Sequence, residues 1–138
     1  MKLLCFGARR FWWSSHAPNL EGEAAVDVED EARDCLVAWL HAEARDEPDD
    51  RRPGVFRKTL KHLKWLAGKQ GTRAIVLHSF AHLGGENADA EWTRAFLAEL
   101  RERLEATEYT VQQTPYGHFC TWSLDVRGES LAKVWKEI

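Results

Sequence analysis

Residues 74–85 read AIVLHSFAHLGG, an apolar run that breaks into small residues at its end. The run has the length and composition of a buried strand, and the glycines that follow it predict a turn. His82 lies at the mouth of that turn. Ligands commonly bind at the carboxyl ends of strands in open α/β sheets, so His82 is a candidate site residue.

A second turn signal lies later in the chain, where residues 114–119 read TPYGHF. Proline and glycine mark a turn there, and residues 118–126 alternate as a new strand. We expect the two turns to form the two walls of one pocket at strand ends.

The other segments alternate between strand and helix patterns. We expect strands over residues 2–6, 10–15, 34–43 and 109–113, a loop over 19–33, and helices that begin at Pro53, after Asp89 and after Gly128. The order is then β–β–β–α–β–α–β–β–α. It predicts a single α/β domain over residues 1–138, with a mixed β-sheet packed with about three helices.

Composition narrows the class of protein. The chain is 44% hydrophobic and 30% charged, which is typical of a globular protein with a core. No apolar run approaches the ~20 residues that span a bilayer, so we expect no membrane partner. Cys5, Cys35 and Cys120 are far apart without a CxxC spacing, which argues against a disulfide framework or a zinc ribbon. We therefore expect a reducing, cytoplasmic setting.

The positive charge is concentrated in one segment. Residues 51–73 contain eight arginines and lysines and no acid, although the net charge of the chain is −3. Such a block attracts phosphates, or it is a solvated helix face balanced by the acidic residues 21–34. The candidate RNA-binding residues on this helix are Arg57, Lys58, Lys61 and Lys64.

The histidines and Cys120 allow several interpretations of their roles. His78 and His82 are four residues apart, but no third ligand lies near them in sequence, so we expect no metal and no cofactor. We therefore expect His78 to be a core or edge histidine, while His82 is either a site residue or a turn residue bonded to the backbone. Cys120 reads as an inert core thiol, with a Cys120–His118 nucleophilic pair as the alternative.

Three segments together resemble a known family. Phe80-Ala81-His82-Leu83, Pro115-Tyr116-Gly117 and Leu131-Ala132 are similar to motifs of the editing domain of archaeal threonyl-tRNA synthetase. The resemblance is clearest from Ala74 to Ile138. It implies a fold shared with the D-aminoacyl-tRNA deacylases, and hydrolysis of serine mischarged onto threonine tRNA with help from the RNA's terminal 2′-hydroxyl. It also implies tRNA as the partner and a possible homodimer.

The same resemblance implies roles for particular residues. His82 would be the catalytic residue, and the substrate-binding residues would be Phe80, Ala81, Pro115, Tyr116, Gly117, His118, Phe119, Cys120 and Lys133. The chain departs from the family at two points. Phe119–Cys120 replaces a Tyr-Lys pair, and Lys133 replaces an acid, so that Lys133 would return a positive charge to the pocket.

These observations lead to three functional hypotheses. The first is a freestanding aminoacyl-tRNA deacylase that removes the amino acid from mischarged tRNA. The alternative is a catalytically inactive binding module of the same fold that recognises an amino acid, a nucleotide or a protein. The third is a thiol enzyme that uses Cys120 with His118, which requires an exposed sulfur.

Overall fold

Two long strands form the centre of the fold in the computed structural model, which describes residues 1–138 throughout. β1 (Lys2–Pro18) and β2 (Glu29–His41) pair antiparallel, with Lys2 opposite His41 and Ser14 opposite Glu29. The buried run from Cys35 to Leu40 lies in β2, so the strand predicted over residues 34–43 is confirmed.

β1 and β2 are both longer than the sequence predicted. Residues 10–15 are not a separate strand but continue β1, and β2 begins inside the stretch that was expected to be a loop. Cross-strand pairing explains the difference, because Arg10 on β1 bonds Glu31 on β2 at 2.7 Å. The acidic composition that suggested a loop is therefore partly matched by basic residues on the neighbouring strand.

Four shorter strands complete the mixed sheet. They are β3 (Ala74–Ser79), β4 (Thr110–Gln113), β5 (His118–Val126) and β6 (Lys133–Glu137). The strand order is β4-β3-β2-β1-β5, with β6 paired to β1 beyond this path. The pairs β2–β3 and β3–β4 are parallel, and the others are antiparallel. The predicted α/β domain with a mixed sheet is confirmed.

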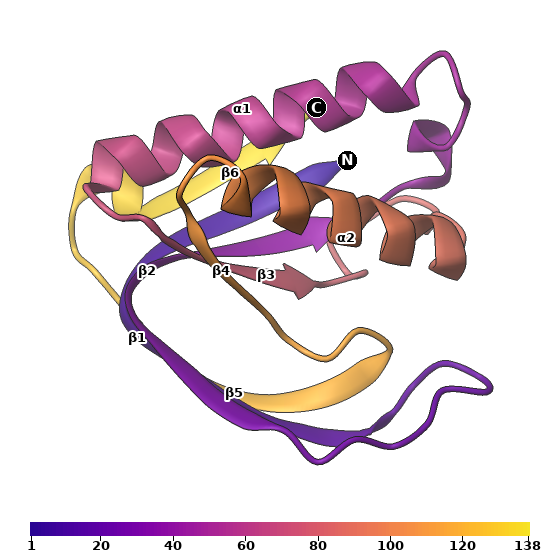
Figure 1. The fold of residues 1–138 in the computed structure, drawn as a ribbon, viewed down its shortest axis with the longest axis horizontal. Helices are drawn as coiled ribbons and strands as arrows, with labels where there is room; N and C mark the ends of the chain where they lie inside the picture. Colours follow the sequence, from indigo (N-terminus) through magenta and orange to yellow (C-terminus); the bar gives the residue numbers. More distant parts are fainter.

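Two α-helices cover one face of this sheet (Figure 1). α1 (Arg52–Gln70) has Pro53 in its first turn and ends at Gly71 with φ +68°, and α2 (Ala90–Glu105) is capped by Asp89, whose carboxylate accepts from the Trp92 N–H at 2.9 Å. Short 3₁₀ turns lie at η1 (Ala44–Asp46) and η2 (Ser130–Ala132). Neither helix has a stretch long and apolar enough to cross a membrane.

The prediction of a third helix after Gly128 is wrong. Residues 130–132 form only the single turn η2, and the chain then enters β6, which pairs antiparallel with the first residues of β1. Val134 and Ile138 pack on the core, while Trp135 is 51% exposed. The spacing of the apolar residues is compatible with a helix and with a strand. The segment forms a strand because the first residues of β1 offer it a free edge for pairing.

Two apolar clusters lie on opposite faces of the sheet. The larger joins both helices to β1, β2, β3 and β4, through residues such as Leu36, Leu63, Leu77 and Phe96. The smaller includes Phe11, Trp13, Val37 and Trp39. Figure 1 shows β5 and the adjoining parts of β1 and β2 curving away from the helices. β5 and the carboxyl end of β3 both contribute residues to one cavity.

Candidate functional site

A cavity of about 330 Å³ opens where β3 ends, α2 begins and the turn from β4 to β5 crosses. The two turns picked out in the sequence both line it. Nine of the predicted site residues contribute to the wall: Phe80, Ala81, His82, Pro115, Tyr116, Gly117, His118, Phe119 and Cys120.

Other lining residues carried no signal in the sequence. Asn19 follows β1, Asn87 lies in the loop before α2, Thr93 is in the first turns of α2, and Trp122 is on β5. No motif connects these positions, because they come from separate elements that meet only in the folded chain.

The cavity wall contains no lysine, arginine, aspartate or glutamate. Lys133 does not line it, contrary to the prediction that its charge returns to the pocket. Lys133 lies at the start of the edge strand β6, and its ammonium donates to the Arg127 carbonyl at 3.2 Å. The titratable groups of the wall are three imidazoles, one phenol and one thiol: His78, His82, His118, Tyr116 and Cys120.

His118 presents an unused acceptor. Its side chain is buried, and Nδ1 lies 3.1 Å from the Tyr116 carbonyl oxygen. A carbonyl can only accept, so in the neutral imidazole Nδ1 carries the proton and Nε2 keeps its lone pair. Nε2 is buried and has no hydrogen-bond partner. A buried acceptor without a partner is unfavourable in the free protein, so a donor from a ligand or water would be bound there.

His78 is a structural histidine. Its Nδ1 lies 2.8 Å from the hydroxyl of Thr114, and its ring contacts those of Trp39 and Phe80. Burial lowers the pKa of His78 to about 4, so the ring is neutral at physiological pH. His82, in contrast, is exposed at the rim of the cavity, where its ring meets Phe80 edge-on at 5.3 Å between centroids. No three His, Cys, Asp or Glu side chains gather as a metal site.

The turn from β4 to β5 is held in a conformation that needs glycine. Gly117 has φ +75°, and its carbonyl accepts from the Asn19 N–H at 2.8 Å. Tyr116 donates its hydroxyl to the Ala90 carbonyl at 3.0 Å, and the Arg94 guanidinium lies 4.9 Å from the centre of its ring. Burial raises the pKa of the Tyr116 phenol, which stays neutral. The turn is thus fixed to both β1 and α2.

Cys120 is less buried than the sequence predicted. The residue is of intermediate exposure and lines the cavity, and its thiol lies 3.8 Å from the carbonyl oxygen of His118. Burial raises the pKa of the thiol, and no cation in the wall opposes this effect. The imidazole of His118 uses Nδ1 on Tyr116. These contacts do not form a thiolate–imidazolium pair.

We expect Cys120 to react slowly with a thiol reagent such as dithionitrobenzoate in the native state. The neutral thiol is a weak nucleophile, and a raised pKa reduces its thiolate fraction further. Cys5 and Cys35 are buried and should react only on unfolding. The part of the reaction that is lost in Cys120→Ser is the part that comes from the Cys120 thiol. Rapid modification of Cys120 with loss of function would instead support the thiol-enzyme hypothesis.

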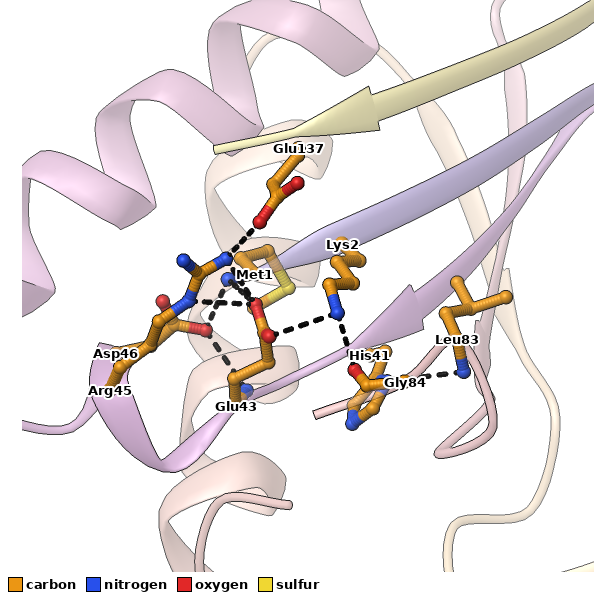
Figure 2. A network of polar contacts seen from close by, with 9 residues as sticks. All are labelled: Met1, Lys2, His41, Glu43, Arg45, Asp46, Leu83, Gly84 and Glu137. Atoms are coloured by element: carbon orange, nitrogen blue, oxygen red, sulfur yellow. Dashed lines mark hydrogen bonds and ion pairs between the residues drawn. The ribbon is translucent and has the colours of Figure 1, made fainter. Parts of the chain in front are cut away.

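The loop that carries His82 is tied to the start of the chain. Figure 2 shows Lys2 between the loop and Glu43: the ammonium donates to the Gly84 carbonyl at 2.6 Å and lies 3.2 Å from a Glu43 oxygen. The Leu83 N–H donates to Nδ1 of His41 at 3.2 Å. A β-carbon on Gly85 would lie 2.6 Å from Glu43 Oε1. The loop is therefore packed closely on the end of β2.

Glu43 is the centre of this network of polar contacts. Its carboxylate is bonded by the Met1 ammonium at 2.9 Å and by Arg45 at 2.8 Å, and Asp46 lies beside it on the same ammonium (Figure 2). Burial alone would raise the pKa of Glu43, but the Met1, Arg45 and Lys2 donors outweigh it and lower the pKa to about 2. The carboxylate is thus ionised at every physiological pH.

The predicted RNA-binding residues lie outside the cavity. Arg57, Lys58 and Lys61 are exposed on α1, and Lys64 is half-buried beside them. None of the four lines the cavity. Any contact that they make with RNA is therefore separate from the chemistry at the two turns.

Comparison with protein families gives one match over the whole length. The family model of the archaea-specific editing domain of threonyl-tRNA synthetase matches residues 1–138.

Curated relatives include the threonine--tRNA ligases of Pyrobaculum arsenaticum and Hyperthermus butylicus. They are 27% and 25% identical over 140 residues, which cover 97% of this chain. That of Thermococcus kodakarensis is 27% identical over 107 residues, or 76% of this chain. The chain spans only 22% of the length of the first two relatives and 16% of the third.

Among solved structures, the c-Myc DNA Unwinding Element Binding Protein superposes with a TM-score of 0.64. The superposition covers 100% of this chain and 99% of that one, at 15% sequence identity. At this identity the likeness shows the fold alone. It agrees with the single α/β domain expected from the sequence.

Proposed function

The chain belongs to the archaea-specific editing domain family of threonyl-tRNA synthetase, and from this premise we propose that it is an aminoacyl-tRNA deacylase that acts in trans on mischarged tRNA. The observation that carries the proposal is the cavity itself. It brings the His82 turn and the Pro115–Gly117 turn together, with imidazoles and main-chain groups but no lysine, arginine or carboxylate in its wall.

The reaction is the hydrolysis of an activated ester, which needs little acid–base power. A water oxygen attacks the carbonyl carbon of the aminoacyl group, and negative charge develops on the carbonyl oxygen. The carbon–oxygen bond to the ribose then breaks, and the ribose oxygen leaves with a proton from the water. Holding the ester and the water in place can supply most of the acceleration.

The two turns would divide this work. The main-chain amides of Ala81, His82 and Gly84 and those of Tyr116–His118 would hold the ester and its developing oxyanion, whereas the Leu83 N–H is already bonded to His41. His82, at the rim, would orient the terminal ribose or the water. The free Nε2 of His118 can accept a hydrogen bond from the water or from the amino group of the substrate. By the family resemblance, the terminal 2′-hydroxyl of the RNA would assist.

The absence of charge in the wall is also the argument for the alternative function. Cys120 lines the cavity where the family resemblance would put a lysine, and Lys133 is not among the residues that line it. A cavity that positions an aminoacyl group without hydrolysing it would be a binding module. The two functions differ in turnover, which the release of amino acid from mischarged tRNA measures.

His82→Ala is expected to lower the deacylation rate roughly a hundredfold, the effect of misplacing a reacting group. The free energy of unfolding should fall by about 1 kcal/mol or less, because His82 is exposed and makes no hydrogen bond to the core. His16→Ala is the matched control, since His16 is also exposed and does not line the cavity. Equal rates for parent and His82→Ala would remove His82 from the site.

The same proposal includes a cytoplasmic location and a homodimeric assembly. All three cysteines are free, and burial raises the pKa of Cys5 to about 12 and that of Cys35 to about 11. Inert thiols of this kind suit the reducing cytoplasm. Exposed Trp122 and Trp135 on the sheet are consistent with a homodimer, as in the family resemblance. Light scattering would measure the assembly directly.

A further inference from the structure

A second hollow lies between α1 and β6. It is an open groove of about 410 Å³. One face of α1 forms its first wall, with Lys58, Lys61, His62 and Trp65 at positions i, i+3, i+4 and i+7. Lys136 on β6 forms the second wall, with Glu137 and Ile138 at its end. None of these residues lines the cavity described above.

The charge in this groove is positive and uncompensated. Lys58, Lys61 and Lys136 are exposed, and no ion pair occupies any of the three ammonium groups. The acid in the lining, Glu137, is paired with Arg45 at 2.5 Å rather than with any of these lysines, and Arg45 also bonds Glu43. Three lysines around one concave surface attract a chain of phosphates more strongly than the same charges spread over a helix.

Trp65 adds an aromatic surface to the lysines. Its side chain is 46% exposed, although tryptophan gains most free energy when it is buried. One side of the ring rests on His62, with 5.8 Å between centroids and 31° between planes. Burial, followed by the charge of Lys136, lowers the pKa of His62, so this imidazole is neutral at physiological pH. The Nε2 atom of His62 has no hydrogen-bond partner in the protein.

We propose that this groove binds an RNA strand, with Lys58, Lys61 and Lys136 on its phosphates and an unpaired base stacked on Trp65. Lysines that follow a backbone beside an exposed aromatic ring are the arrangement by which proteins hold single-stranded nucleic acid. The groove would hold the body of the tRNA while its aminoacylated end enters the cavity. The choice of tRNA as the ligand rests on the proposed function. Of the basic residues on α1, the proposal assigns RNA binding only to those that line the groove.

The test is RNA binding as a function of salt, with uncharged tRNA and single-stranded oligouridine as the probes. Trp65→Ala should weaken both complexes about tenfold, and Trp65→Phe, which keeps a ring, should restore most of the affinity. Lys58→Glu with Lys61→Glu should weaken both and lower the slope of log K against log salt by about 1.4, at about 0.7 for each phosphate contact.

Lys64→Glu is the matched control, because Lys64 lies on the same helix and carries the same charge but does not line the groove. It should change affinity much less than Lys58→Glu or Lys61→Glu alone. Equal losses for Lys64→Glu and the groove variants, or full binding by Trp65→Ala, would overturn the proposal.

Binding and hydrolysis can fail separately in this experiment. Deacylation of a short aminoacylated RNA that is too small to reach the groove should be unaffected by the groove variants. A parent protein that binds RNA through the groove but hydrolyses no ester would keep this inference and reject the deacylase. If the parent hydrolyses the ester while the groove variants bind tRNA normally, the deacylase is kept and the RNA-binding groove is rejected.

Discussion

Gly117→Val is expected to reduce deacylation roughly a hundredfold, the effect of losing a main-chain donor that holds an oxyanion. Gly117 has φ +75°, which a β-branched residue avoids, and an added β-carbon would lie 3.1 Å from Leu20 and 3.3 Å from Glu23. The turn must therefore move, and with it the amides of Tyr116–His118. The strain should lower the free energy of unfolding by about 1–3 kcal/mol.

Gly128→Val provides the comparison for this variant. Gly128 lies in the turn after β5 with a negative φ, and a β-carbon there meets nothing within 4 Å. Steady-state kinetics and urea unfolding of the two variants separate loss of the site from loss of the fold. If Gly117→Val hydrolysed aminoacyl-tRNA at the parent rate, the turn would have no part in holding the ester.

Glu43→Ala should lower the free energy of unfolding by about 3 kcal/mol, which is large for one residue. The carboxylate is buried among the Met1 ammonium, Lys2 and Arg45, and its removal leaves these cations without their shared partner. Lys2 would also lose the anion that holds it against the Gly84 carbonyl, so the loop bearing His82 should loosen. Urea unfolding at neutral pH measures the effect.

The same carboxylate gives the protein a defined sensitivity to acid. The pKa of Glu43 is lowered from 4.5 to about 2 in the folded state, so the unfolded chain takes up the proton first. The stabilisation is complete above pH 4.5 and is lost as the pH falls toward 2. Glu102→Ala, at an exposed position on α2, should leave both the stability and its pH dependence unchanged. An equally steep loss of stability between pH 4.5 and 2 in Glu43→Ala would show that the acid sensitivity lies elsewhere.

The central part of the fold could be predicted from local patterns. Pro53, Gly71 and Asp89 mark helix ends, and each acts through its own backbone geometry or hydrogen bond, so its meaning does not depend on distant residues. Residues 74–77 are apolar throughout because β3 is buried between two parallel neighbours.

The errors have one physical cause. Residues 29–33 and 133–137 are polar or ambiguous in sequence, and each becomes a strand because β1 offers it a partner. Pairing across the sheet is a long-range effect that no local window contains. The same limit applies to Lys133: its place outside the cavity follows from the pairing of β6 with β1.

Some residues of the candidate site could likewise be predicted from local patterns, and others could not. The two turns could be identified from His82 and from Pro115–Gly117, because strand-end turns have their own residue preferences. Asn19, Thr93 and Trp122 could not, because they belong to separate elements that meet at the cavity only through long-range packing. The free Nε2 of His118 is likewise a consequence of a contact with the Tyr116 carbonyl that only the folded turn creates.

The most direct test of the account is the hydrolysis of mischarged tRNA by the whole chain. Seryl-tRNA specific for threonine and a panel of other aminoacyl-tRNAs would be incubated with the parent protein, with Gly117→Val and without protein. We predict that the parent releases the amino acid from at least one mischarged tRNA many times per protein molecule, and that Gly117→Val does so roughly a hundredfold more slowly. Release no faster than in the absence of protein, across the panel and with tRNA bound, would contradict the deacylase and leave the binding module.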